Sequence, residues 1–359
     1  MFECNVFDIK SPLCYNPINC VVIWFLPHDI EFFYFFWGWM CIMKIEVLLY
    51  SFNGVDYLGE QLQSILKQDI ADKAELKILA FDDGSTDRTK DILERYQHEG
   101  KLKLITGDGV GKTKGYWELL KKADEADFYA FSEQDDVWFP EKLSRAIKYL
   151  ETQAILDGEE TEVANGPLLY VSDYVVTNAK LKPIRFNRSK ACKFSDVEHN
   201  LLYSSNPGCT FVFNDAARQK MIKYDVNAFY ADTYDDLAKK ILNLTGKVVL
   251  DRVPTVYMRR NKGDKFGAEY YGGLKGAIKL YKELYFGKVF NTKSETAKAL
   301  GLVYADEIMN DSRKKEALKQ VGSYREDQVN RERLMQSSRF VVGDYHDKWL
   351  MAAIKKNRL

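Results

Sequence analysis

The chain has 359 residues, enough for one large domain or two smaller ones with a sizeable hydrophobic core. Lys and Arg together number 52, as do Asp and Glu, so no overall positive field points to a nucleic-acid-binding protein. Most cysteines lie within the first 41 residues; Cys192 and Cys209 show no metal-binding spacing, which favours a reduced, cytoplasmic protein.

The first 42 residues differ in composition from the rest. Residues 32–39 are almost all aromatic, but Pro27 and Glu31 keep the apolar runs shorter than a membrane span. The segment also lacks the basic start and small-residue cleavage site of a signal peptide. Because Met43 leads directly into a strand pattern, we expect residues 1–42 to be an extension from a mis-assigned start. A membrane-touching anchor is the second interpretation.

From residue 44 the pattern alternates strands and helices, which predicts a parallel sheet covered by helices. Strands are expected at 45–50, 76–81, 102–105, 128–131, 168–172, 211–213, 248–250 and 255–258, with apolar-faced helices between several of them. Residues 151–165 are expected to form a polar loop, and the chain beyond about residue 267 to be mostly helical. The first four strands are typical of half a doubly wound sheet, in which ligands gather at the carboxyl ends of the strands.

The most informative stretch is Phe128–Pro140, where an apolar strand pattern stops at Glu133, Asp135 and Asp136 before Pro140 opens a helix. Carboxylates at the end of a buried strand are costly unless a charged partner lies against them. The pattern indicates a divalent cation held by Asp135, with Glu133 or Asp136 nearby, that could bind a phosphate. The alternative is an acidic loop that caps the helix.

A second polar loop, Gly107–Thr113, reads Gly-Asp-Gly-Val-Gly-Lys-Thr and lies between a predicted strand and a predicted helix. A phosphate-binding P-loop has the same setting but requires a glycine where this chain has Thr106. The loop also follows the third strand, with no convincing second acidic strand in the order that P-loop nucleoside triphosphatases use. We therefore set the P-loop interpretation aside.

Four motifs follow one another along the chain: Leu48–Gly54, Phe81–Asp87, Phe131–Trp138 and Pro207–Asn214. In this order and spacing they resemble family 2 glycosyltransferases, and most of all the rhamnosyltransferase-like bacterial branch that builds cell-surface polysaccharides. The resemblance implies the GT-A fold, a single nucleotide-sugar-binding α/β domain with a mostly parallel central sheet. We expect this catalytic domain at 43–265, after the extension 1–42 and before a helical C-terminal region at 266–359.

The resemblance also implies how a nucleotide is bound. The implied residues are Ser51, Phe52, Asn53, Asp82, Asp83, Glu133, Arg259 and Arg260. Ser51 and Phe52 would line the base with main-chain contacts. Asp82 or Asp83 would accept the hydrogen bond from the base imide N–H, a task that suits an acceptor-only carboxylate. One of the two arginines would lie near the diphosphate.

Metal binding and catalysis follow from the same resemblance. Glu133–Asp135 stands where the family has its Asp-x-Asp motif, so Asp135 is expected to bind Mg²⁺ or Mn²⁺ that bridges the donor pyrophosphate. Asp235 is the expected general base, which would activate an acceptor hydroxyl and give inversion without a covalent intermediate. The chain departs from the family at Glu133, where Asp is usual, and at Tyr234, where His is preferred. These departures leave the identity of the donor open.

The expected function is that of an inverting glycosyltransferase in bacterial cell-surface polysaccharide synthesis. The donor would be dTDP-rhamnose or a UDP-hexose, the acceptor a lipid-linked saccharide or an oligosaccharide, and no nucleic acid would be bound. We expect Asp173, Gly208, Cys209 and Asp236 around the sugars. A nucleotidyltransferase could share the alternating sheet, but it would carry a Gly-rich basic loop after the first strand, unlike residues 51–54. A scaffold that keeps the fold without turnover is the non-enzymatic alternative.

The C-terminal region mixes basic residues such as Lys275 and Lys279 with Tyr281 and Leu284. This composition suits the surface of an anionic membrane. It equally suits a helix packed on the catalytic domain, with lysine stems lying along apolar surface. The expected location is the cytoplasm. Under the first interpretation of the C-terminal region, the protein would also attach peripherally to the inner face of the cell membrane.

Overall fold

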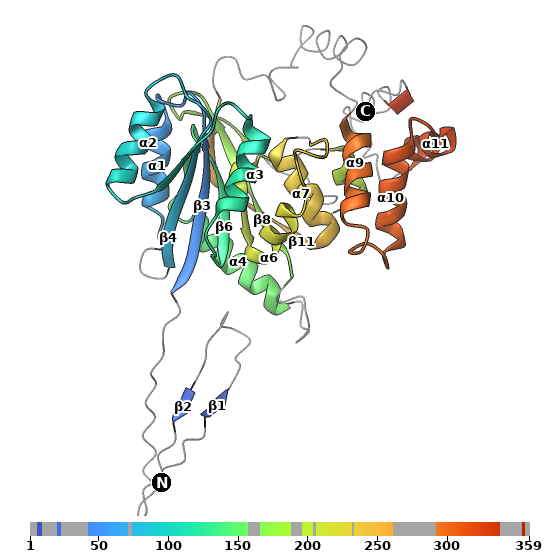
Figure 1. Ribbon diagram of the computed structural model, residues 1–359, viewed down its shortest axis with the longest axis horizontal. Coiled ribbons are helices and arrows are strands. Elements are labelled where there is room, and N and C mark those ends of the chain that lie inside the picture. The colour runs from blue at the N-terminus through green and yellow to red at the C-terminus, as the bar shows by residue number, and fades with distance from the viewer. Residues whose placement is uncertain are drawn as a thin grey trace, which may run out of the picture.

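The computed structural model describes residues 6–8, 20–22, 42–70, 74–156, 166–187, 196–203, 206–231, 233–260, 292–337 and 354–355. The aromatic segment at 32–39 and the basic segment at 275–284 lie outside the described residues. Two short strands, β1 (Val6–Asp8) and β2 (Cys20–Val22), pair antiparallel with each other. The other described strands belong to one sheet (Figure 1).

The central sheet has the order β5-β4-β3-β6-β10-β8-β11-β7, and β9 pairs with β8. Its strands are β3 (Met43–Ser51), β4 (Ala74–Asp82), β5 (Lys103–Thr106), β6 (Phe128–Glu133), β7 (Val137–Trp138), β8 (Leu168–Thr177), β9 (Pro183–Asn187), β10 (Phe211–Asn214) and β11 (Lys247–Arg259). The neighbours β5, β4, β3 and β6 are parallel, as half of a doubly wound sheet requires. Beyond them β10 is antiparallel to both neighbours, and β11 is parallel to β8. The sheet is therefore mixed, and its parallel half carries three of the four motifs.

The described helices cover both faces of this sheet. They are α1 (Leu58–Leu66), α2 (Thr89–His98), α3 (Lys112–Lys122), α4 (Lys142–Leu156), α5 (Val197–Leu202), α6 (Asp215–Ile222), α7 (Tyr234–Thr245), α9 (Thr292–Val303), α10 (Ser312–Ser323) and α11 (Gln328–Gln336). Successive side chains of a strand point to opposite faces. On β3, Val47 and Leu49 therefore join the core formed with α1, α2 and α4, whereas Leu48 and Tyr50 join the core formed with α3, α6 and α7. Figure 1 shows α1 and α2 on one side of β3 and α3 on the other.

The described C-terminal helices continue the second of these cores. Leu300 of α9 and Leu318 of α10 are buried in the same cluster as Leu237 and Ile241 of α7. Figure 1 places α9 and α10 next to α7, at the end of the molecule away from α1 and α2. Within the described residues, none of the helices combines the length and the apolar character that a bilayer-spanning segment requires.

Three expectations about elements were wrong in part. The loop expected at 151–165 begins later, because no Gly or Pro interrupts the helix and α4 extends to Leu156. The two strands expected at 248–250 and 255–258 are one strand, β11, whose pairing with β8 is irregular around Pro254. Proline lacks the N–H that a regular ladder uses, so the break in the pattern marks an irregularity instead of a strand end. Finally, β8 continues to Thr177, which places Asp173 inside the strand.

Candidate active site

The carboxyl ends of β3, β4 and β6 lie level with one another. The pairing register sets Ser51 beside Asp82 and Tyr50 beside Glu133. Because these strands are parallel, the loops that follow them emerge at the same edge of the sheet. The fourth motif joins them through a short 3₁₀ helix, Gly208–Thr210, which packs against β6. All four motifs therefore meet at one edge.

Asn53 ties the loop after β3 to the loop after β4. Its N–H donates to Ser85 Oγ at 2.9 Å, and its Oδ1 accepts from the N–H of Thr86 at 2.8 Å. The φ angle of Asn53 is 50°, in the left-handed region that asparagine tolerates better than most residues with a side chain. The residue is thus used to shape the edge of the site.

Gln134 ties the loop after β6 to the loop after β3. Its Oε1 accepts from Ser51 Oγ at 2.8 Å and from the Phe52 N–H at 2.7 Å, and its Nε2 donates to the Phe52 carbonyl at 2.9 Å. A Cβ on Gly54 would lie 2.2 Å from Gln134 Oε1, so a side chain there would displace the amide that makes these bonds. These bonds use both main-chain groups of Phe52, which had been expected to face a base. The Phe52 side chain, which is 45% exposed, is the accessible part of that residue.

Asp82 and Asp83, at the end of β4, are both buried, and both carboxylate oxygens of Asp83 accept hydrogen bonds from within the protein. Its carboxylate accepts from the Tyr50 hydroxyl at 2.7 Å and from the N–H groups of Gly109–Gly111 at 2.8 to 3.1 Å. Consecutive N–H groups of this kind form an anion-binding nest, and here the anion is an internal side chain. Asp82 Oδ1 accepts from Ser85 Oγ at 2.5 Å. The loop that resembles a P-loop therefore directs these N–H groups at Asp83.

Glu133 connects α3 with α7. Its Oε2 lies 2.5 Å from Lys112 Nζ, and its Oε1 accepts from the Tyr234 hydroxyl at 2.6 Å. Burial alone would raise the pKa of Glu133, but the Lys112 ammonium holds it below its ordinary value. The Tyr234 ring stacks on Tyr116 with centroids 3.8 Å apart, and a Cβ on Gly208 would lie 2.3 Å from Tyr234. The position of Glu133 is thus fixed from both sides.

Asp135 and Asp136, which follow Glu133, differ in burial. Asp136 is buried, and its Oδ1 accepts from the Arg259 N–H at 3.3 Å. Burial and the neighbouring carboxylates raise the pKa of Asp136 well above its ordinary value. Asp135 is only half-buried. Among the described residues no three His, Cys, Asp or Glu side chains are grouped so that they could hold a metal ion by themselves.

Arg259 anchors the acidic loop through a hydrogen bond to the main chain of Asp135. Its Nε donates to the Asp135 carbonyl at 2.9 Å, its Nη1 to the Ala179 carbonyl at 2.6 Å, and its Nη2 to Glu60 Oε2 at 2.5 Å. The guanidinium also lies 4.4 Å from the centre of the Tyr57 ring, and the residue is 5% exposed. Each of its three nitrogens is therefore used within the protein. The neighbouring Arg260, by contrast, is half-buried.

Asp235 lies in the first turn of α7. Its Oδ1 accepts from Thr233 Oγ1 at 2.5 Å and from the Asp236 N–H at 2.9 Å, while its Oδ2 accepts from the Gly208 N–H at 3.3 Å. The residue is half-buried, and burial raises the pKa of its carboxyl group. A carboxylate with a raised pKa is a stronger base, which suits proton abstraction from a hydroxyl group.

Of the residues expected around the sugars, Gly208 and Asp236 contact that carboxylate through their main-chain N–H groups. Cys209 is buried, and burial raises the pKa of its thiol. Asp236 is buried and forms an ion pair with Lys240 at 2.7 Å. Asp173 is buried within β8. A sugar-binding role for these three stays a prediction.

Two residues that contact several parts of the site had no assigned role. Gln134 lies between the carboxylates of Glu133 and Asp135 in the sequence. Its amide, directly after a strand, is the local signal for a role in the loop. Lys112 belongs to the segment set aside as a P-loop. Nothing local indicates its contact with Glu133, because that contact depends on how α3 packs beside β6.

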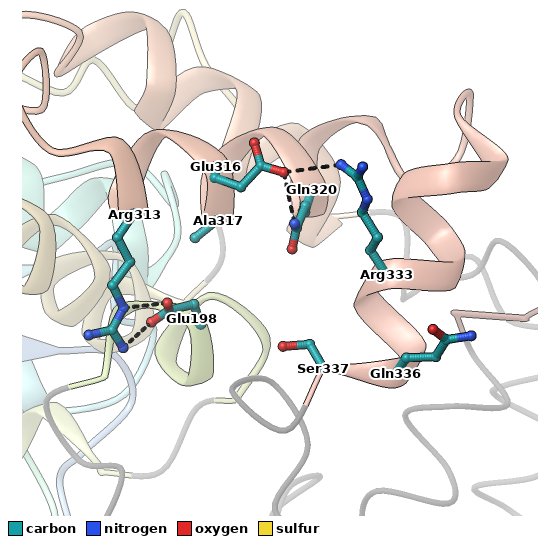
Figure 2. Close-up of a pocket in the computed structure, with 8 residues that line it drawn as sticks. All are labelled: Glu198, Arg313, Glu316, Ala317, Gln320, Arg333, Gln336 and Ser337. Carbon is teal, nitrogen blue, oxygen red and sulfur yellow. Dashed lines mark hydrogen bonds and ion pairs between the residues drawn. The ribbon is translucent and has the colours of Figure 1, made fainter.

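A separate cavity of about 320 Å³ lies among α5, α10 and α11 (Figure 2). Arg313 pairs there with both oxygens of Glu198 at 2.5 and 2.7 Å. Glu316 accepts from Gln320 at 2.9 Å and lies 3.6 Å from Arg333. The charged side chains that line this cavity pair with one another, and none of the four sequence motifs contributes a residue to it. We therefore place the candidate site at the sheet edge.

Comparison with known proteins agrees with this geometry. Residues 46–193 match the family model described as Glycosyl transferase family 2. The dTDP-rhamnosyl transferase RfbG of Shigella flexneri is 25% identical over 230 residues, which are 61% of this chain and 73% of RfbG. The poly(ribitol-phosphate) beta-N-acetylglucosaminyltransferase TarS of Staphylococcus aureus is 33% identical over 114 residues, 31% of this chain but only 19% of TarS.

The fold has a counterpart among solved structures. The crystal structure of TarS residues 1–349 in complex with UDP-GlcNAc superposes with a TM-score of 0.50 and 17% identity, over 86% of this chain and 79% of that one. At this level of identity the likeness concerns the fold alone. Residues 46–193 are therefore a match to glycosyl transferase family 2, and the α/β domain that contains them has the GT-A fold.

Proposed function

We propose that the chain is an inverting glycosyltransferase that moves a sugar from dTDP-rhamnose or a UDP-hexose to a lipid-linked or oligosaccharide acceptor in bacterial cell-surface polysaccharide synthesis. The name of RfbG supports a dTDP-sugar donor, and the name of TarS supports transfer of a sugar to a polymer. The observation that carries the proposal is the joining of the loops after β3, β4 and β6 by Asn53 and Gln134, with Asp235 beside them.

The nucleotide would lie against the loops after β3 and β4. Phe52 would contact the base with its exposed ring, because its main-chain groups are bonded to Gln134. Asp82 would accept the imide N–H, because the carboxylate of Asp83 is taken by Tyr50 and the following loop. Arg260 is a better candidate than Arg259 for contact with the diphosphate, because each of the three guanidinium nitrogens of Arg259 donates a hydrogen bond within the protein.

A Mg²⁺ or Mn²⁺ ion would be held by Asp135. The donor set fits, since Mg²⁺ is often bound by one or two carboxylates together with substrate phosphates. Glu133 would not be a ligand, because Lys112 and Tyr234 use its two oxygens. When bound, such an ion supplies neutralisation of the charge on the leaving diphosphate.

Asp235 would act as the general base. Its carboxylate takes the proton of the acceptor hydroxyl while that oxygen forms a bond to the anomeric carbon. The bond from this carbon to the donor phosphate oxygen breaks, and its electron pair leaves with the nucleoside diphosphate. Attack from the face opposite the leaving group inverts the anomeric centre. Support comes from the raised pKa of Asp235 and its place next to Gly208.

The test is the variant Asp235→Asn, which keeps the size of the side chain but cannot accept a proton. Loss of a general base is expected to lower kcat by about 10²-fold to 10⁴-fold, with donor binding retained. The matched control is Asp225→Asn, an exposed aspartate outside the site, which should behave like the wild type. If Asp235→Asn turns over every donor as the wild type does, the assigned base is wrong.

We also propose domain boundaries near residues 43 and 265 and contact of the region 266–359 with anionic lipid. A chain that begins at Met43, the first residue of β3, should bind nucleotide as well as the full chain. The full chain should float with liposomes that contain anionic lipid. Loss of binding in the first experiment, or absence from the lipid fraction in the second, would remove the corresponding part of the proposal.

A further inference from the structure

We propose that the Lys112 ammonium binds the diphosphate of the nucleotide donor and that Glu133 and Tyr234 hold it in position. This inference rests on the proposed function, because it names a further residue of the donor site. Lys112 is the first residue of α3 and belongs to the Gly-Val-Gly-Lys-Thr segment that lacks one glycine of a P-loop. The side chain of Lys112, and not the N–H groups of the loop before it, would bind the diphosphate.

The position of Lys112 is central in the candidate site. Its Nζ lies 2.5 Å from Glu133 Oε2 and 5.5 Å from the centre of the Tyr234 ring. Partial burial of the side chain would lower the pKa of Lys112, but Glu133, Asp235 and Asp135 together raise it above its ordinary value. The ammonium therefore stays charged, and it lies near both the expected metal ligand and the expected base.

Lys112 is also accessible to a ligand. Its side chain is 44% exposed. It lines a cavity of about 380 Å³ between the first turn of α3 and the segment 226–231 that precedes α7. A diphosphate that enters from this side can meet the ammonium without any rearrangement of the core. Since Lys112 lies in contact with Glu133, the same group can bridge the protein carboxylate and the ligand.

The chemistry requires such a cation. A nucleoside diphosphate gains negative charge as it leaves, and positive groups aimed at that charge lower the barrier. Arg259, one of the two arginines expected there, donates from each of its three nitrogens to Asp135, Ala179 and Glu60. The N–H groups of Gly109–Gly111 bind Asp83. Two obvious sources of positive potential are thus committed inside the protein, whereas Lys112 faces the site.

The surrounding side chains act as supports for Lys112. Tyr234 is fixed by stacking on Tyr116 and by the close approach of Gly208, so its hydroxyl fixes Glu133. Glu133 in turn fixes Lys112. The three residues of this chain of contacts come from α7, β6 and α3. Glu133, the first carboxylate of the segment Glu133–Asp135, is therefore a positioning residue for Lys112.

Binding of small nucleotides tests the inference without an acceptor. Calorimetric titration with UDP, dTDP and GDP, and with the matching monophosphates, would be done in excess Mg²⁺. Loss of a charge-assisted contact in Lys112→Met should weaken diphosphate binding by about 10-fold to 100-fold. Monophosphate binding should change by less than about threefold, because the base contacts remain. The matched control is Lys121→Met, an exposed lysine in the last turn of α3 that does not line this cavity and should keep wild-type affinities.

A double variant separates direct contact from simple charge balance. Lys112→Met alone leaves the Glu133 charge uncompensated, whereas Lys112→Met with Glu133→Gln keeps the net charge of the wild type. If the double variant still binds diphosphates weakly, direct contact is supported. If it regains wild-type affinity, or if Lys112→Met binds diphosphates as the wild type does, the inference is overturned. A wild type that binds none of the nucleotides would refute the proposed function, and this inference with it.

Discussion

Glu46 allows a quantitative test of the packing of the sheet. It lies near the start of β3, is 2% exposed, and its Oε2 has no hydrogen-bond partner. Burial, together with the nearby Asp124 carboxylate, raises the pKa of Glu46 from 4.5 to about 7. The folded protein therefore binds more protons than the unfolded chain between these two pH values. Its stability should fall as the pH rises through this window.

The size of the effect follows from the two pKa values of Glu46. A difference of about 2.5 pH units corresponds to roughly 3 kcal/mol, most of which develops between pH 5 and pH 8. The variant Glu46→Gln removes this titration but keeps the shape of the side chain. Any constant cost of a buried amide cancels when the difference between variant and wild type is compared at two pH values. That difference should move by about 2 kcal/mol in favour of the variant from pH 5 to pH 8.

Urea denaturation of both proteins at pH 5, 6, 7 and 8 measures the effect of Glu46→Gln directly. The matched control is Glu75→Gln on the neighbouring strand β4, where 48% of the glutamate side chain is exposed. This control should change by less than about 0.5 kcal/mol at any pH. If the Glu46→Gln and wild-type stabilities stay parallel from pH 5 to pH 8, the burial argument for Glu46 is refuted.

Two further substitutions test contacts that build the site. Gly208→Ala would place a Cβ 2.3 Å from Tyr234 and should lower the free energy of unfolding by about 1 to 3 kcal/mol in urea denaturation; unchanged stability would contradict this packing. Asp83→Asn turns an NH₂ group toward the N–H groups of Gly109–Gly111 and should cost about 1 to 3 kcal/mol. Hydrogen exchange should speed up at those amides, and unchanged protection would show that another group holds the loop.

The strands and helices between residues 43 and 133 could be predicted because their apolar residues follow the periods of regular structure. Leu48 and Leu49 belong to the cores on the two faces of the sheet, as alternation along a strand requires. Elements such as β7 and α5 are too short to show a period. At Pro254 the local pattern suggested a strand end where the structure has an irregular strand.

The same contrast holds for the candidate site. The acidic motif could be located because an apolar strand pattern stops there, whereas Asp235 was expected as the base only through the resemblance to the family. The contacts that select among residues are long-range: Asp83 is joined to Gly109–Gly111, Arg259 to Glu60, and Lys112 to Glu133. None of these pairings leaves a local signal in the sequence. The structure was therefore needed to separate residues that face the site from residues that hold it together.

The most direct test of the account is whether a nucleotide sugar binds at the sheet edge with Asp135 involved. Thermal unfolding would be followed with dTDP-rhamnose, UDP-glucose, UDP-galactose, UDP-N-acetylglucosamine and GDP-mannose, each with and without Mn²⁺, for the wild type and Asp135→Ala. We expect Tm to rise with a dTDP or UDP donor, only when Mn²⁺ is present, and the rise to be absent in Asp135→Ala. A folded wild type whose Tm does not respond to any donor, or a variant that responds as the wild type does, would contradict the account.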